Sequence, residues 1–196
     1  GVPTPTTCFV EDPGQVEGLA PKLSYPVVIK PRSSWTIQGG EWVKSKVEYA
    51  LNAPDLLAKY PRAHHRAPLP MLQELVVGPG CGIFALMDHG EPRASFAHLR
   101  LREKPPWGGE SVLRESVPMD PVLQEYAFRL LRSLSWHGVA MVEFKRDQAS
   151  RLPKLMEING RCWGSLQLAI DAGINFPYLL YQMATHGEVE PPGDYR

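Results

Sequence analysis

Two glutamates lie in neighbouring segments whose residues alternate between apolar and polar, the pattern that is typical of β-strands. Glu143 belongs to segment 139–145, and Glu157 belongs to segment 155–161, whose sequence is LMEINGR. The polar stretch between the segments predicts a turn, so that the two strands form an antiparallel hairpin. In that hairpin Glu143 lies opposite or nearly opposite Glu157, and Asn159 lies on the same face because side chains alternate along a strand.

These side chains have the chemistry of a metal site. Two carboxylates that face each other across a strand pair repel, so a cation between them would stabilise the arrangement. Hard divalent cations bind carboxylate and amide oxygens, and Mg²⁺ commonly carries phosphates. We therefore predict Glu143, Glu157 and Asn159 as ligands of Mg²⁺, with Mn²⁺ as an alternative. Arg161, two residues further along, is predicted to act catalytically on a transferred phosphoryl group or an anionic intermediate.

Two segments earlier in the chain have the properties of nucleotide-binding strands. The strand-like run 25–30 ends in Lys30, whose ammonium group would emerge at the rim of a sheet and could meet a phosphate. A lysine that only marks a strand end is an equally good interpretation. The run 73–77 leads into Gly78, and its exposed backbone groups could bind the edge of an adenine ring. Taken alone, Glu74 is better explained as a solvated charge at a strand edge.

Several other residues have simpler explanations. Four residues lie around a predicted loop at 100–111, and for them solvent exposure and substrate contact are equally good interpretations: Arg100, Arg102, Lys104 and Ser111. Core or lid packing is favoured over a substrate pocket for Trp107 and Trp163. No ligand-like spacing relates the histidines, which we interpret as surface or core residues: His64, His65, His98 and His137.

Composition limits the partners and the compartment. The 21 basic and 21 acidic residues give a formal charge of zero, which does not favour nucleic acid or a membrane surface as a partner. No apolar stretch approaches the roughly 20 residues that span a bilayer. The three cysteines are widely spaced, which predicts reduced thiols and a cytoplasmic protein.

The ordered set of these segments resembles the ATP-grasp superfamily, particularly its carboxylate–amine ligases and its carbamoyl-phosphate-synthase-like branch. The set comprises YPVVIKP, a loop with a glycine pair, QELVVGPG, GVAMVEFK and LMEINGR, and it covers essentially the whole chain. The resemblance implies an α+β fold in which two α+β lobes hold a nucleotide in the cleft between them. Residues 1–75 would form a smaller lobe that is truncated at its N-terminus, and residues 76–196 would form a larger lobe that carries the metal site.

The resemblance also implies roles for individual residues. Lys30 would contact the phosphates or the adenine, and Leu155 would pack on the adenine ring. Glu143 and Glu157 would hold Mg²⁺, with Asn159 on a second ion, and Arg161 would contact the transferred phosphoryl group. The segment that joins the two lobes would bind the adenine edge through Glu74, Leu75, Val76 and Val77.

The implied activity is that of an ATP- and Mg²⁺-dependent ligase, which activates a small-molecule carboxylate as an acylphosphate for capture by an amine or a similar nucleophile. A small-molecule kinase and a non-catalytic nucleotide-binding domain are the alternatives, and a homodimer is an open alternative to a monomer.

Two features depart from the family pattern. Many members have an acidic residue after the hinge for the ribose, whereas residues 78–82 are GPGCG and predict a turn. The chain also starts at Gly1 without the family's N-terminal domain. We therefore expect more sequence upstream, and weak nucleotide binding or inactivity of this chain alone is an alternative outcome.

Overall fold

The computed structural model describes residues 1–104, 109–190 and 192–195 and combines helices with antiparallel sheets, so the predicted α+β class is confirmed. The chain divides into a small unit, Pro5–Leu75, and a large unit, Gly1–Thr4 with Val76–Arg196. The predicted lobes, 1–75 and 76–196, differ from this division in the first four residues. These residues belong to the large unit because the Leu155 N–H donates to the Pro3 carbonyl (2.8 Å).

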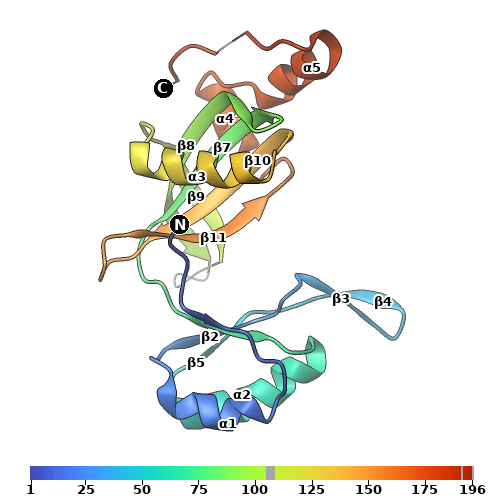
Figure 1. The fold of residues 1–196 in the computed structure, drawn as a ribbon, viewed down its shortest axis with the longest axis vertical. Coiled ribbons are helices and arrows are strands. Elements are labelled where there is room, and N and C mark those ends of the chain that lie inside the picture. Colours follow the sequence, from blue (N-terminus) through green and yellow to red (C-terminus); the bar gives the residue numbers. More distant parts are fainter. Residues whose placement is uncertain (105–108, 191, 196) are drawn as a thin grey trace. The chain divides into compact units, whose positions relative to one another are not determined.

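The small unit is a four-stranded antiparallel sheet with helices on one of its faces (Figure 1). Asn52 begins the longest of these helices, because its side chain accepts a hydrogen bond from the Asp55 N–H (2.9 Å). The sheet order is β1 (Thr7–Cys8), β6 (Met71–Glu74), β2 (Val27–Lys30) and β5 (Glu48–Ala50). The helices are α1 (Gln15–Leu19), the 3₁₀ helix η1 (Ala20–Lys22) and α2 (Ala53–Arg66), and a separate hairpin comprises β3 (Trp35–Gln38) and β4 (Glu41–Lys44).

The large unit is built on a five-stranded antiparallel sheet. Its order is β11 (Pro153–Asn159), β10 (Gly138–Arg146), β7 (Gly80–Asp88), β8 (Glu91–Lys104) and β9 (Glu110–Ser116). Helix α3 (Pro121–Ser133) covers one face of this sheet (Figure 1). Helices α4 (Leu166–Asp171) and α5 (Phe176–His186) pack on the other face.

Each face of this sheet has its own apolar core. Ala85, Val142 and Phe144 belong to the cluster beneath α3, whereas Phe84 and Met141 belong to the cluster beneath α4 and α5. The separation follows from the alternation of side chains along β7 and β10. One end of the second face is left to polar residues, and the candidate site lies there.

Two loop predictions are wrong in part. The predicted loop at 100–111 is instead largely occupied by β8 and β9, whose pairing continues from Arg100–Arg114 to Lys104–Glu110. The predicted turn at 78–82 is limited to its first residues, since Gly80 begins β7 and Gly82 pairs with both Glu143 and His98.

Among the described residues, no helix is long and apolar enough to cross a lipid bilayer.

Candidate functional site

The hairpin of β10 and β11 forms as its sequence pattern predicted. Glu143 pairs directly with Glu157, and Met141 pairs with Asn159. The carboxylates, and the amide two residues further along β11, therefore share one face of the sheet. The Asn159 side chain donates from Nδ2 to Glu157 Oε1 (2.7 Å), which leaves its amide oxygen available for another partner.

A β-bulge in this hairpin places Leu155 away from the carboxylates. The register shifts between Glu143 and Phe144, because Phe144 pairs with Leu155 and Met156 is the extra residue. Leu155 consequently packs against the apolar cluster beneath α3, on the opposite face from Glu157. The structure thus does not bring Leu155 together with the predicted metal ligands, and its predicted contact with an adenine ring remains untested.

A pocket of about 370 Å³ lies over the carboxylate face, within the large unit. Its wall includes all four residues predicted from the hairpin: Glu143, Glu157, Asn159 and Arg161. The remaining wall comes from β8, from β9 and the residue before it, from β10 and from the segment after β11, and it includes His98, Arg100, Gly109, Ser111, Arg114, Met141, Trp163, Gly164 and Ser165. Trp107 lies outside the described residues, so its predicted packing is not addressed.

Arg100 provides the positive charge next to the buried carboxylate. Glu143 is only 7% exposed, and Arg100 Nη2 donates to its Oε1. Arg100 also forms an ion pair with Glu103 (Nη1 to Oε1, 3.3 Å), and Lys145 Nζ lies 3.4 Å from Glu103 Oε2. Burial raises the pKa of Glu143, Arg100 opposes this effect, and Glu157 reinforces it. A further positive charge near Glu143 would therefore stabilise the ionised form of its carboxyl group.

Two glycines of β7 leave room for side chains of β8, Gly80 for Arg100 and Gly82 for His98. A Cβ atom added to Gly80 would lie 2.8 Å from Arg100 Cδ, and one added to Gly82 would lie 2.7 Å from His98 Nε2. Any larger side chain at these two positions would occupy the space through which β8 side chains extend over β7. We call this gap above Gly80 and Gly82 the glycine trough.

His98 is a buried, neutral neighbour of the carboxylate. It is 2% exposed, its Nδ1 lies 3.2 Å from Ser165 Oγ, and its ring meets Phe84 edge-on at 4.7 Å. Burial, followed by the charges of Arg100 and Arg114, lowers the pKa of His98 to about 3. The histidine therefore adds no positive charge to the pocket at physiological pH, and it links β8 to the segment that follows β11.

The predicted catalytic arginine lies at the edge of the pocket. Arg161 is exposed, and its Nη1 donates to the Cys162 carbonyl (3.0 Å). The guanidinium group belongs to an exposed side chain in the wall of the pocket.

The predicted nucleotide-contacting residues lie in the small unit and at the start of the large unit. Lys30 ends β2 with a partly exposed side chain, and Glu74 Oε1 accepts a hydrogen bond from the Thr6 N–H (2.9 Å). Leu75 is partly buried, Val76 is buried, and Val77 is exposed.

Sequence reasoning did not find every residue of the pocket wall. It treated Arg100 as an arginine that could equally be solvated, and it gave no role to Arg114. Arg114 Nη2 donates to the Ser111 carbonyl. Trp163 lies in the apolar core and also in the pocket wall, so core packing and a place in a pocket both describe it. One sequence signal could have indicated that Arg100 lies in the pocket wall: His98 and Arg100 alternate along β8 opposite Gly82 and Gly80 of β7.

Comparison with known proteins identifies the family. Residues 67–195 match the model of the family described as "ATP-grasp in the biosynthetic pathway with Ter operon". This chain belongs to the ATP-grasp superfamily. The match includes the whole β10–β11 hairpin and every residue of the pocket wall. No curated protein sequence matches the chain.

Solved ATP-grasp structures share the fold. A biotin carboxylase–beta-gamma-ATP complex from Campylobacter jejuni is similar with a TM-score of 0.78 and 17% identity, over 97% of this chain and 44% of that one. An L-amino acid ligase from Bacillus licheniformis is similar with a TM-score of 0.67 and 20% identity, over 97% of this chain and 48% of that one. N5-carboxyaminoimidazole ribonucleotide synthetase from Thermotoga maritima has a TM-score of 0.67 and 16% identity, over 99% of this chain and 48% of that one.

These identities show the fold alone, and the chain spans less than half the length of each of these structures. The ATP-grasp fold of this chain is thereby supported.

Proposed function

We propose that this chain is the ATP-grasp part of a ligase that uses ATP and Mg²⁺ to activate a small-molecule carboxylate for capture by an amine. The observation that supports it best is the pairing of Glu143 with Glu157, with Asn159 and Arg161 in the wall of the same pocket. Family membership supplies the ATP-dependent chemistry, and this cluster supplies the oxygen ligands that such chemistry requires.

The residues present fit a magnesium ion. Glu143 is a buried carboxylate whose pKa is raised by burial, so it gains from a nearby positive charge. Glu157 and the amide oxygen of Asn159 complete an all-oxygen set, which suits Mg²⁺ better than a softer metal. When bound, the ion would withdraw charge from the phosphates of ATP.

The protein's own contribution is positioning and charge. The carboxylate of the substrate would attack the γ-phosphorus; the bond to the bridging oxygen of ADP breaks, and an acylphosphate forms. An amine would then attack the acyl carbon, lose a proton and release inorganic phosphate. Arg161 would stabilise the phosphoryl group in transfer, with Lys30 as a second phosphate contact, and Glu74 to Val77 would bind the adenine.

The first test is calorimetric titration of the chain with a non-hydrolysable ATP analogue, with and without Mg²⁺. Glu157→Gln removes one negative charge with little change in shape, and we expect it to abolish Mg²⁺-dependent binding. Glu125→Gln is the matched control, since Glu125 lies exposed on α3 in a surface ion pair with Arg129. Full Mg²⁺-dependent binding by Glu157→Gln would refute the metal assignment.

Product analysis tests the reaction type. ADP release that depends on a carboxylate, with hydroxylamine trapping of an acyl hydroxamate, is expected of the ligase. Stoichiometric phosphorylation of a hydroxyl compound without trapping would instead identify a kinase, and Mg²⁺-dependent nucleotide binding without ADP release would identify a binding domain. We further propose a cytoplasmic location, supported by the free thiols of Cys8, Cys81 and Cys162.

A further inference from the structure

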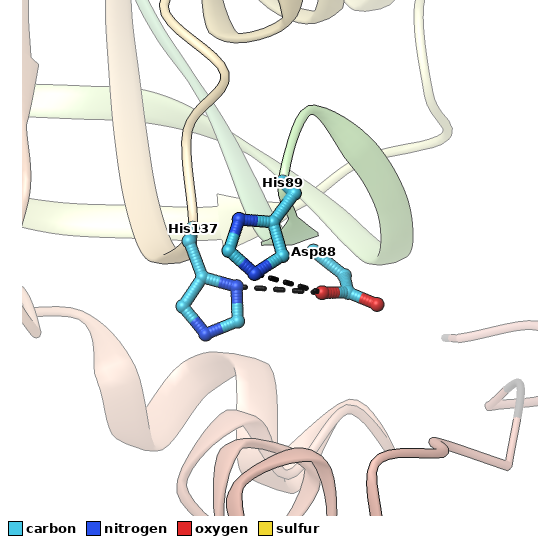
Figure 2. Close-up of side chains that lie close together, drawn as sticks. All are labelled: Asp88, His89 and His137. Carbon is cyan, nitrogen blue, oxygen red and sulfur yellow. Dashed lines mark ion pairs between the residues drawn. The ribbon is translucent and has the colours of Figure 1, made fainter.

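Two histidines and an aspartate converge at the end of the large sheet that is remote from the carboxylate pocket. Asp88 ends β7, His89 follows it in the turn, and His137 precedes β10. One ligand atom from each residue lies within 4.8 Å of the others. Figure 2 shows the two imidazole rings side by side, each with a nitrogen facing the same carboxylate.

The distances are close to those of a metal's first coordination shell. His137 Nδ1 lies 3.4 Å from Asp88 Oδ1, and His89 Nε2 lies 4.0 Å from the same oxygen (Figure 2). Ligand atoms about 2.0–2.1 Å from a tetrahedral ion are separated by roughly 3.3 Å. The rings are stacked with centroids 4.3 Å apart, and each has a nitrogen within 4.0 Å of the same carboxylate oxygen.

The carboxylate is already oriented by a second residue. Arg93 Nη2 donates to Asp88 Oδ2 (2.7 Å), which leaves Oδ1 to face the imidazoles. Hydrogen bonding of a ligand carboxylate by an outer residue is a common feature of metal sites.

The two loops that carry the histidines are fixed to each other. The Gly90 N–H donates to the Trp136 carbonyl (2.8 Å), and Gly138 pairs with Met87 in the sheet. His89 has a φ of 47°, a left-handed conformation that is uncommon for residues other than glycine. The backbone therefore holds the two imidazoles near each other without any ion, which lowers the entropic cost of binding one.

We propose that Asp88, His89 and His137 bind a borderline divalent cation of the Zn²⁺ class. Imidazole nitrogens favour such ions over Mg²⁺, whereas the all-oxygen set of the carboxylate pocket favours Mg²⁺. Along β7, Asp88 is six residues from Gly82, the partner of Glu143, which is roughly 20 Å of strand. The cation site is therefore separate from the proposed catalytic site and clamps two loops of the large unit.

Calorimetric titration of the full chain with ZnCl₂ tests the proposal. We expect one Zn²⁺ per chain, and at least a tenfold loss of affinity in His137→Ala and in His89→Ala. His65→Ala, which removes an exposed histidine of α2, should bind Zn²⁺ as the unmodified chain does. These side chains are exposed, so the substitutions are expected to leave the fold intact, which circular dichroism would verify.

A second variant separates this site from the carboxylate pocket. Glu157→Gln should keep the Zn²⁺ affinity unchanged, whether or not it loses Mg²⁺-dependent nucleotide binding. The proposal is overturned by any of three results: no saturable Zn²⁺ binding, unchanged affinity after removal of either histidine, or loss of Zn²⁺ binding in Glu157→Gln.

Discussion

The ion pair between Arg100 and Glu143 predicts a destabilisation that depends on pH. In Arg100→Leu an apolar side chain would fill the space over Gly80 and keep water from the carboxylate. Breaking a buried ion pair by removing one partner typically costs about 3–5 kcal/mol, because the other charge stays buried without compensation. Glu143 qualifies, since its side chain is only 10% exposed and that of Arg100 is 16% exposed.

Protonation of Glu143 limits this cost. The ordinary pKa of a glutamate carboxyl group is 4.5, and protonating Glu143 in the folded state costs about 1.4 kcal/mol for each pH unit above that value. This cost is the upper limit of the destabilisation, because the variant can always fold with Glu143 protonated. The limit is about 3.4 kcal/mol at pH 7 and about 0.7 kcal/mol at pH 5. We therefore expect Arg100→Leu to lose about 3 kcal/mol of unfolding free energy at pH 7 and less than about 1 kcal/mol at pH 5.

The sign follows from proton linkage. Burial raises the pKa of Glu143 in the folded state, so the folded state holds this proton more tightly than the unfolded state does. The contribution of the group to stability is then greatest below pH 4.5 and is lost as the pH rises through the folded-state pKa. Removal of Arg100 raises that pKa further, and the deficit of the variant grows with pH.

Urea denaturation at the two pH values measures the effect. Arg129→Leu is the control, because the Arg129–Glu125 pair (2.9 Å) is exposed on α3 and should contribute less than about 1 kcal/mol at either pH. An equal loss at pH 5 and pH 7 would mean that packing, not charge, explains the role of Arg100. An unchanged stability at pH 7 would refute the buried ion pair itself.

Three further changes have defined outcomes. Gly82→Ala places a Cβ 2.7 Å from His98 Nε2 and should cost about 1–3 kcal/mol, measured by thermal denaturation. Asp120→Ala removes the N-cap of α3 and an ion pair with Arg146, at about 1–2 kcal/mol. Burial acts to raise the pKa of Asp120, but these contacts outweigh burial and lower that pKa from its ordinary value of 3.8. The contribution of Asp120 to stability is therefore present above pH 3.8 and is lost as the pH falls through the folded-state pKa. Lys30→Ala should weaken nucleotide binding about tenfold or more by calorimetry, and an unchanged affinity would remove Lys30 from the site.

The carboxylate pair could be predicted from the sequence because it depends only on local rules. Alternation places Glu157 and Asn159 on one face, and a short polar connection makes an antiparallel hairpin the simplest pairing with Glu143. The hairpin's register then follows within a residue. The side of Leu155 could not be predicted in this way, because one bulged residue reverses the alternation beyond it and no residue type marks the bulge.

The partner of Glu143 could not be predicted by the same rules. Arg100 is 43 residues away in sequence, and its strand joins β10 only through β7. An arginine in a polar stretch is compatible with solvent exposure as well as with burial, so its type alone does not decide. Only the strand order β10–β7–β8 places Arg100 within reach of the carboxylate.

The glycine trough explains why that reach is possible, and it changes the interpretation of the glycines themselves. Gly80 and Gly82 suggest a turn, since glycine is common in turns and weakens strands. In the structure both are strand residues, and each lies beside a β8 side chain that extends across β7. The missing side chain of Gly80 thus leaves the space through which Arg100 extends to Glu143. Gly80→Ala should therefore separate Arg100 from Glu143 and reproduce the pH-dependent destabilisation of Arg100→Leu, whereas a destabilisation that is independent of pH would limit the role of Gly80 to packing.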